Sequence, residues 1–414
     1  MANEQFRVLF LVENVPYALD TRVRREAHTL RAAGASVTVI CPGPAGDSST
    51  AHDGIRVYHY PKPSFGGGFL AHLAEYAASL CWHTLLSAWV AVRHGFDVIH
   101  VANPPDLLWL VAAPYRLFGK RFIFDHHDLV PELFAVRFGS RLPRLSSLMI
   151  ALERSSIRLA NHVISTNETF RRIAIERGGK SPNAVSIVRN GPWLGRDFPR
   201  VTPDLQVRAL GRIVVGYLGI MNDQDHLDHL LEAARIVRLE AGREDIAFVL
   251  IGSGDAYSKL LRLRDAMGLT DGVHMPGTLP WNEVLAALSA VDICVQPDPP
   301  TAFNRHLTMN KLMEYMALGK PSIAFDMPET RFSGGDAVMY VPGESPHNLA
   351  QAILALADDA DMRDTLGRRA RQRIESSLAW EHQAANLIEV DIMVFDSVFP
   401  ERIIIGNKLK VLIN

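Results

Sequence analysis

One short segment combines a cation and a carboxylate at helical spacing beside an apolar run. Within residues 307–321, Lys311 and Glu314 are three positions apart, so a helix places both on one face. Residues 291–295 form an apolar run, and another follows at 322–325. We therefore predict that this helix is the crossover of a βαβ unit and that it begins near the carboxyl end of a strand, where α/β proteins bind ligands.

The chemistry of this segment suits a nucleotide. A carboxylate such as Glu314 can accept two hydrogen bonds from the vicinal diol of a ribose. The free N–H groups at the helix start, on Thr308, Met309 and Asn310, can hold a phosphate, with Lys311 beside them. The alternative is an ordinary solvated ion pair between Lys311 and Glu314.

Two glycine-rich turns are predicted in the second half of the chain. Gly219 directly follows one apolar run, and Gly252 and Gly254 follow the next. Glycine lets the backbone approach a ligand closely, so the two turns together suit a phosphate site, with plain turn chemistry as the alternative. Residues 223–225 have an Asp-x-Asp form, which we interpret as solvated loop acids and not as metal ligands.

Ionisable residues also gather after two apolar runs of the first half. Asp106 follows the first of these runs, and His127, Asp128 and Glu132 follow the second. Groups at the ends of parallel strands commonly face a ligand. The sequence shows no third ligand for a metal ion there, and hydrogen bonding within the loops is the alternative interpretation.

Strand-like runs alternate with helical patterns along both halves. This alternation predicts an α/β fold with two Rossmann-like domains, each a doubly wound parallel sheet with helices on both faces. A loop-rich stretch at 190–203 separates the halves. We expect Asp20 to cap the first helix, and no dinucleotide at the first loop, 13–19, which lacks Gly-x-Gly-x-x-Gly. The expected strands are 6–12, 37–41, 98–100, 122–124, 163–165, 185–188, 213–218, 247–251, 273–275, 291–295 and 322–325. The expected helices include 20–33, 226–239, 258–267 and 281–289, and the chain is expected to be helical from 342 to about 399.

Composition narrows the class of protein. The chain has 414 residues, 48% hydrophobic and 21% charged, enough apolar residues for two cores. Cys41, Cys81 and Cys294 are widely spaced, which argues against a zinc site or a disulfide framework and fits a reducing cytosol. There is no signal-peptide pattern and no uncharged apolar run of roughly 18 residues, so we expect a cytoplasmic protein. Lys plus Arg number 43 against 45 Asp plus Glu, and we expect no nucleic-acid partner.

The run at 311–321 resembles the nucleotide-sugar segment of retaining glycosyltransferases of the GT-B fold, family 4, in a form similar to exopolysaccharide and O-antigen biosynthesis enzymes. That family carries two glutamates eight residues apart, the second of which holds the donor ribose. Glu314 matches the second, and His306 stands at the first.

A second departure concerns the phosphate. The family usually has an Arg and a Lys that neutralise the donor diphosphate, where this chain has Ile220 and Asp225. A buried diphosphate needs positive partners. We therefore expect Lys311 or Arg305 to replace the missing cations, and we expect Lys311 to contact the diphosphate.

The resemblance implies roles for individual residues. His127 is implied to lie nearest the transferred sugar and to share the catalytic role with Glu314. The implied donor-binding residues are Gly219, Gly252, Gly254, Arg305, His306, Thr308, Met309, Asn310, Lys311 and Glu314. The implied acceptor-side residues are Arg22, Asp106, Asp128 and Glu132, with a solvated helix charge as the alternative for Arg22.

The implied function is metal-independent transfer of a sugar, with retention, from a nucleoside diphosphate sugar to a hydroxyl of a saccharide or polyprenyl-linked saccharide. No cofactor beyond the substrate is implied. The implied domains are 1–200 on the acceptor side, 208–380 on the donor side, and 381–414 as a helix crossing back to the first domain plus a tail. The alternatives are a catalytically inactive nucleotide-sugar-binding protein and an isomerase similar to UDP-sugar 2-epimerases. The donor base (UDP, GDP or ADP), the acceptor and the oligomeric state stay open.

Two stretches, 69–92 and 137–158, mix apolar and charged residues in a way that suits peripheral contact with the inner face of a cell membrane. Ordinary core helices of an α/β domain have the same composition and are the alternative.

Overall fold

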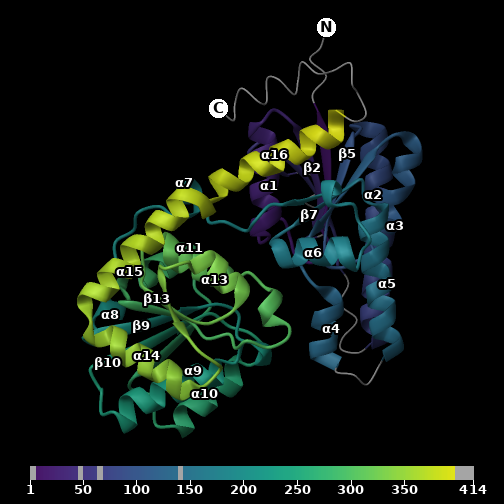
Figure 1. The fold of residues 1–414 in the computed structure, drawn as a ribbon. Helices are drawn as coiled ribbons and strands as arrows, with labels where there is room; N and C mark the ends of the chain where they lie inside the picture. Colours follow the sequence, from purple (N-terminus) through teal and green to yellow (C-terminus); the bar gives the residue numbers. More distant parts are fainter. Residues whose placement is uncertain (1–5, 45–49, 63–68, 139–142, 397–414) are drawn as a thin grey trace. The chain divides into compact units, whose positions relative to one another are not determined.

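The protein is described by a computed structural model that covers residues 6–44, 50–62, 69–138 and 143–396 (Figure 1). The chain divides into two compact units, one made of residues 1–189 and 382–414 and the other of residues 190–381. The sequence predicted the boundary between the two domains at 200–208 and the return to the first domain at 380–381, where the structure has them at 189–190 and 381–382. The predicted tail after residue 396 lies outside the described residues.

The first unit is built on an eight-stranded sheet with the order β3-β4-β2-β1-β5-β6-β7-β8. All neighbours are parallel except β3 and β4. The strands are β1 (Arg7–Leu11), β2 (Ser36–Pro42), β3 (Thr50–His52), β4 (Ile55–Tyr60), β5 (Val98–Ala102), β6 (Arg121–His126), β7 (His162–Ser165) and β8 (Val185–Ile187). The helices are α1 (Thr21–Ala32), α2 (Phe69–Arg93), α3 (Trp109–Ala112), η1 (Ala113–Phe118), α4 (Val130–Phe138), α5 (Pro143–Leu159), α6 (Glu168–Glu176), η3 (Pro182–Ala184) and α16 (Trp380–Asp396).

The order of strands places a switch point between β1 and β5, where the connections change direction. Residues after the carboxyl ends of these strands and of β6 therefore share one edge of the sheet, the edge at which α/β proteins bind ligands. Strand β5 is buried along its whole length, as a continuous apolar run in the middle of a parallel sheet requires. Helix α1 begins as predicted, because the Asp20 side chain accepts a hydrogen bond of 2.9 Å from the Val23 amide.

Helix α16 comes from the far end of the chain and completes the first unit. From His382 onward it belongs to that unit. Its Asp391 Oδ1 lies 2.8 Å from Nε2 of the buried His100 on β5, and Phe395 packs edge-to-face on Phe6 at 4.7 Å between ring centroids. A polar and an aromatic contact thus both hold this helix to the unit formed by the start of the chain.

The second unit holds a six-stranded, entirely parallel sheet with the order β11-β10-β9-β12-β13-β14. The strands are β9 (Ile213–Leu218), β10 (Ile246–Ile251), β11 (Val273–Gly277), β12 (Ile293–Gln296), β13 (Ser322–Phe325) and β14 (Val338–Val341). The helices are α7 (Leu194–Asp197), α8 (Leu205–Arg208), η4 (Asp223–Asp225), α9 (Leu227–Arg235), η5 (Ile236–Glu240), α10 (Tyr257–Ala266), α11 (Trp281–Ala290), η6 (Asn304–His306), α12 (Asn310–Ala317), α13 (Pro328–Gly334), α14 (Pro346–Asp358), α15 (Ala360–Arg373) and η7 (Ile374–Leu378).

The predicted fold class is confirmed, since both units are doubly wound parallel-sheet α/β structures with separate cores. The switch point of the second sheet lies between β9 and β12, so the glycine turns after β9 and β10 and the segment leading into α12 meet at one edge. Some predicted bounds were wrong. The strand expected from residue 291 begins at Ile293, and the helix expected from residue 226 begins at Leu227, because His226 has a left-handed backbone with φ 48°.

Strands β3, β4 and β14 were not predicted. Strand β3 pairs antiparallel with β4 at the sheet edge, and its three residues are too few to show a period in the sequence.

Candidate functional site

The two glycine turns of the second unit pack backbone against backbone. Gly252 has φ 132°, and a Cβ atom there would lie 1.9 Å from the carbonyl oxygen of Gly219. A Cβ on Gly254 would lie 2.6 Å from the carbonyl oxygen of Met221. The turns are also joined by hydrogen bonds, including one of 3.1 Å from the Met221 amide to the Ser253 carbonyl. Glycine is therefore required at 252 and 254 by this close approach, whatever else the turns do.

Lys311 lies at the same edge and is the centre of a buried polar cluster. Its Nζ donates to both carboxylate oxygens of Asp298, at 3.0 and 3.1 Å, and to the hydroxyl of Tyr217 at 3.3 Å. The ammonium also lies 5.0 Å from the centroid of the Tyr217 ring, a cation–π contact. A Cβ on Gly219 would lie 3.2 Å from Cε of Lys311, so the first glycine turn and this lysine are direct neighbours.

The charge of Lys311 is secured by Asp298. Burial by itself lowers the pKa of the ammonium, but the charge of Asp298 outweighs it and raises the pKa well above its ordinary value. Gln296 donates to Asp298 at 3.1 Å, while the Oε1 atom of Gln296 is buried with no hydrogen-bond partner among the described residues. The cluster therefore keeps a permanent cation beside the glycine turns, and its polar groups are only partly satisfied.

Helix α12 begins later than the sequence suggested. Its first residue is Asn310 and its N-cap is Met309, so the prediction of Thr308 among the first-turn amides was wrong. The first-turn amides belong to Asn310, Lys311 and Leu312, of which Leu312 already donates to the Met309 carbonyl at 3.2 Å. The shift follows from the extended backbone at Met309. Tyr315 anchors the helix to the sheet, because its hydroxyl accepts from the Leu218 amide at 2.8 Å.

Glu314 is half-buried on α12, one turn beyond Lys311. The ion pair that Lys311 forms within the described chain is with Asp298. The alternative of a surface ion pair between Lys311 and Glu314 was therefore wrong, because the nearby Asp298 carboxylate, only 3% exposed, offers the cation a better desolvated partner.

Two further predicted donor residues, Arg305 and His306, lie on η6 before α12. Arg305 is exposed on η6, and its Nε donates to the Pro300 carbonyl at 3.0 Å. His306 ends η6 and is half-buried. Ile220 is 63% exposed. Burial raises the pKa of Asp225, against the opposing charge of Lys311. Among the residues that the structure describes, Lys311 is thus the cation whose side chain lies against the first glycine turn.

In the first unit the structure links two of the predicted polar residues, Arg22 and His127, through Asp125. Arg22 on α1 donates to Asp125 on β6 through two hydrogen bonds of 2.6 and 2.7 Å, and Asp125 lies 3.1 Å from Nδ1 of His127. Arg22 is 5% exposed, so the alternative of a solvated helix charge was wrong. The arginine holds the carboxylate, and the carboxylate orients the imidazole.

These contacts decide the charge of His127. Burial lowers the pKa of the imidazole, but the charge and hydrogen bond of Asp125 outweigh it and raise the pKa to about 9. Burial also raises the pKa of Glu26 to about 8. Arg22 Nη2 lies 3.1 Å from Glu26 Oε1, an ion-pair distance without hydrogen-bond geometry. At neutral pH the site therefore holds an imidazolium, and burial favours the protonated form of Glu26.

Asn103 organises the loops around His127. Its Oδ1 accepts from the amides of His127 and Asp128 at 2.9 and 3.1 Å, and its Nδ2 donates to Asp106 Oδ1 at 3.0 Å. Asp106 is 3% exposed, its Oδ2 has no partner among the described residues, and burial raises its pKa to about 7. Glu132 pairs with Arg177, which also donates to Glu153 at 2.6 Å. In this structure Asp106 and Glu132 are thus engaged within the protein.

Several site residues were not among those predicted. Asp298, Tyr217, Asp125 and Asn103 each lie at or just after the carboxyl end of a strand. That position is the signal that could have identified them, since polar residues are unusual at the end of a buried parallel strand.

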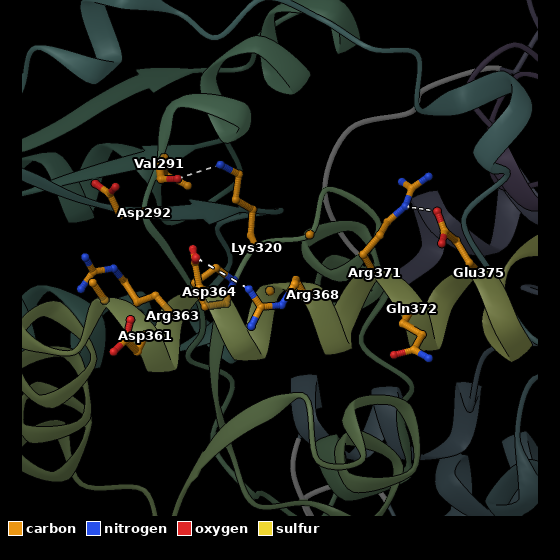
Figure 2. Close-up of a pocket in the computed structure, with 14 residues that line it drawn as sticks. Val291, Asp292, Lys320, Asp361, Arg363, Asp364, Arg368, Arg371, Gln372 and Glu375 are labelled. Atoms are coloured by element: carbon orange, nitrogen blue, oxygen red, sulfur yellow. Dashed lines mark hydrogen bonds and ion pairs between the residues drawn. The ribbon is translucent and has the colours of Figure 1, made fainter.

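A cavity of about 640 Å³ lies elsewhere in the second unit (Figure 2). It is lined by the residues that precede β12 and β13 and by α15, so it lies at the amino ends of the strands, opposite the glycine turns. Two of its cationic groups are engaged within the protein: Lys320 donates to the Val291 carbonyl at 2.9 Å, and Arg371 donates to Glu375 at 2.6 Å. It is not the site predicted from the sequence.

Comparisons with known proteins agree with this geometry. The model described as "Glycosyl transferase 4-like domain" matches residues 18–191, and that described as "Glycosyl transferases group 1" matches residues 212–359. A 2-deoxystreptamine N-acetyl-D-glucosaminyltransferase of Streptomyces fradiae is 25% identical over 349 residues, 78% of this chain and 80% of the relative.

Two solved structures share the fold. A sucrose-phosphate synthase from Thermosynechococcus elongatus superposes with a TM-score of 0.76 at 18% identity, covering 95% of this chain and 100% of the other. HepE of Anabaena, solved in complex with UDP, superposes with a TM-score of 0.67 at 14% identity, covering 93% and 99%. The two family matches lie one in each unit, and together with the two parallel sheets they show that the chain belongs to the group 1 glycosyltransferases and has the GT-B fold.

Proposed function

We propose that the protein transfers a sugar from a nucleoside diphosphate sugar to a hydroxyl acceptor with retention of configuration and without a metal ion in the chemical step. One observation carries the donor assignment: two interlocked glycine turns, Lys311 with its side chain 13% exposed, and the start of α12 meet at the switch point of the second sheet. Such an edge, with free amides and a cation, is suited to a phosphate group.

The proposed roles follow from charge. Lys311 and the first-turn amides of α12 stabilise the diphosphate as the bond to the sugar breaks, and Glu314 accepts hydrogen bonds from the ribose hydroxyls. The acceptor hydroxyl attacks the anomeric carbon on the face that the diphosphate leaves. The bond from that carbon to the diphosphate oxygen breaks, and the hydroxyl proton passes to an oxygen of the departing diphosphate. His127 is positively charged at neutral pH, because its pKa is raised to about 9. It therefore suits hydrogen-bond donation to a sugar oxygen and not the stabilisation of positive charge at carbon.

The first test is release of nucleoside diphosphate over a panel of UDP-, GDP- and ADP-sugars, each with and without saccharide and polyprenyl-linked acceptors, in the presence of EDTA. HepE binds UDP, so UDP-sugars come first. We expect release from one base class that depends on the acceptor, and NMR of the product should show the anomeric configuration of the donor. An inverted product, or loss of all activity in EDTA, would contradict the proposal.

A second test addresses Glu314 directly. Replacing it by Gln keeps one acceptor oxygen and removes the charge, and charge-assisted hydrogen bonds contribute about 1.5 to 3 kcal/mol. We expect kcat/KM to fall roughly tenfold to hundredfold with an unchanged melting temperature. Glu283→Gln, at an exposed position on α11, is the control. Normal donor affinity in Glu314→Gln would remove the ribose assignment.

One observation favours a second candidate. The cation at the glycine turns is already engaged by Asp298, and Ile220 and Asp225 supply no positive charge, which fits a protein that binds a nucleotide sugar without transferring it. Saturable donor binding with no product over the whole panel would support that candidate. Conversion of the donor to an epimer without any acceptor would instead support the isomerase.

Peripheral membrane contact is part of the proposal for a lipid-linked acceptor. None of the helices in the described ranges is long and apolar enough to cross a membrane. Helix α2 buries Ser79, His83 and Ser87, while Leu85, Trp89 and other large side chains are exposed. An outward apolar surface with interfacial Trp is suited to a headgroup layer. Flotation with anionic vesicles tests this, and recovery of all protein in the soluble fraction would contradict it.

A further inference from the structure

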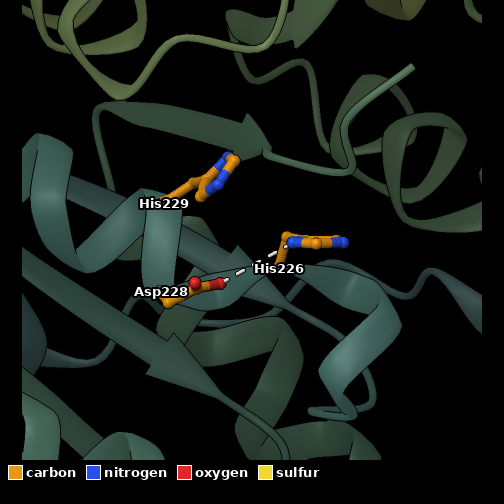
Figure 3. A group of neighbouring side chains, drawn as sticks. All are labelled: His226, Asp228 and His229. Atoms are coloured by element: carbon orange, nitrogen blue, oxygen red, sulfur yellow. Dashed lines mark ion pairs between the residues drawn. The ribbon is translucent and has the colours of Figure 1, made fainter. Parts of the chain in front are cut away.

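A group of three potential metal ligands lies at the start of α9, outside the residues used above. His226, Asp228 and His229 each offer one ligand atom, and these atoms lie within 4.8 Å of one another. Figure 3 shows Asp228 and His229 on the first turn of α9 and His226 just before it, with their side chains close together. The group is the one such cluster of three among the residues that the structure describes.

The distances are short enough for one ion. His226 Nδ1 lies 3.9 Å from Asp228 Oδ1, and the two imidazole rings lie 5.3 Å apart between centroids. A tetrahedral Zn²⁺ with bonds of about 2.0 to 2.2 Å requires ligand atoms about 3.3 Å apart. His226 and His229 are half-buried and Asp228 is exposed, so rotation about their side-chain torsions can shorten these distances.

The ring nitrogens of His226 and His229 are not used for hydrogen bonds to other residues that the structure describes. The rings of His100, His126 and His127 each bond a carboxylate. By contrast, the ring nitrogens of His226 and His229 make no hydrogen bond to the described protein, and Nδ1 of His229 is buried without a partner. Buried polar atoms without partners are uncommon and indicate a missing partner such as an ion or water.

The backbone supports the grouping. His226 has φ 48°, in the left-handed region that disfavours residues with a side chain. This conformation turns the chain from η4 into α9, so that a residue before the helix and two residues on its first turn share one side (Figure 3).

We propose that His226, Asp228 and His229 form a binding site for a divalent transition-metal ion, of which Zn²⁺ is the best match to two imidazoles and one carboxylate. Three protein ligands leave at least one position for water. The ion takes no part in sugar transfer; it stabilises the turn between η4 and α9. The assignment is independent of the proposed function, because it concerns metal binding and stability.

The test uses the full chain after treatment with EDTA and dialysis. Co²⁺ serves as a spectroscopic probe, and Zn²⁺ binding is measured by competition against it. We expect one equivalent of Co²⁺ to give visible absorption bands of a low-coordinate histidine site, and Zn²⁺ to displace it. Zn²⁺ should raise the melting temperature, and EDTA should reverse the rise.

Variants locate the site. His226→Gly removes a ligand while suiting the left-handed backbone, so that folding is preserved. His229→Gln and Asp228→Asn remove the other two. Each should weaken Zn²⁺ binding at least tenfold and abolish the thermal shift, whereas His347→Gln, on α14 of the same unit, should change neither. Wild-type affinity in His226→Gly and His229→Gln, or equal loss in His347→Gln, would overturn the proposal.

Discussion

Lys311 has a structural partner as well as a proposed ligand, and single substitutions do not separate these roles. Asp298 is only 3% exposed, so Lys311→Met leaves a buried carboxylate unpaired. Breaking one side of a buried pair costs roughly 3 to 5 kcal/mol. We expect Lys311→Met to lower the free energy of unfolding in urea by about that amount and to weaken nucleotide binding.

The double variant Lys311→Met/Asp298→Asn distinguishes the two effects. It removes both charges, so most of the stability should return, while nucleotide affinity should stay low because the cation is still missing. Nucleotide binding that recovers together with stability would show that Lys311 acts only on the fold.

His127 makes a pH-dependent contribution to stability. Its pKa in the folded protein, about 9, lies above the ordinary value of 6.5. The protonated form therefore stabilises the fold fully below pH 6.5, and this stabilisation is lost as the pH rises through about 9. The contribution is on the order of 3 kcal/mol.

We test this by measuring the free energy of unfolding from pH 6 to pH 10. His127→Asn should show a smaller decline than the wild type, whereas His347→Asn should not differ from it. The pKa of Glu26 lies in the same pH range. The test therefore compares the decline of the free energy of unfolding between variant and wild type, and does not depend on the decline in the wild type alone. Equal declines in His127→Asn and wild type would contradict the assignment of charge.

At the scale of elements, the two glycine turns form one interlocked unit at the ends of β9 and β10. Gly252→Ala places a Cβ against the Gly219 carbonyl oxygen, at 1.9 Å before any adjustment. Both turns must then move, so we expect a loss of stability well above the roughly 1 to 2 kcal/mol of left-handed strain alone.

Gly268→Ala is the matched control. Gly268 also has a positive φ, 72°, but nothing lies within 4 Å of its added Cβ. It should show only the strain cost, with unchanged nucleotide affinity. Urea unfolding and nucleotide titration of both variants check this. Equal losses of stability and of nucleotide affinity in the two variants would show that the close contact between the turns contributes nothing to either.

At the scale of the whole molecule, each unit has its own sheet and core, and the proposed donor-binding residues all lie in the second unit. A ligand that binds one folded unit stabilises that unit by about 2.7 kcal/mol at a hundredfold excess over Kd. For a unit of this size that corresponds to roughly 5 to 10 °C.

Scanning calorimetry with UDP, GDP or ADP should therefore raise one of two unfolding transitions and leave the other in place. The control is Glu314→Gln, in which the shift should shrink at the same nucleotide concentration. A shift of both transitions by the same amount would show that the units unfold together, contrary to this expectation.

The sequence by itself determined the features that depend on near neighbours in the chain. The apolar runs predicted the strands of both sheets except β3, β4 and β14, because a strand buried on both faces must be apolar throughout. Asp20 predicted its helix start, because a cap acts on amides three residues away. The spacing of Lys311 and Glu314 predicted that both lie on one helix.

The tertiary structure alone decided which charges pair. Asp298 pairs with Lys311. Asp125 pairs with Arg22, which lies 103 positions earlier, and Asp391 pairs with His100, which lies 291 positions earlier. A buried charged group pairs with an opposite charge that is buried next to it. Which groups are buried together depends on elements that come into contact only when the sheets form. For the same reason the charge of His127 could be found only in the folded chain, since it depends on a carboxylate that a distant arginine holds in place.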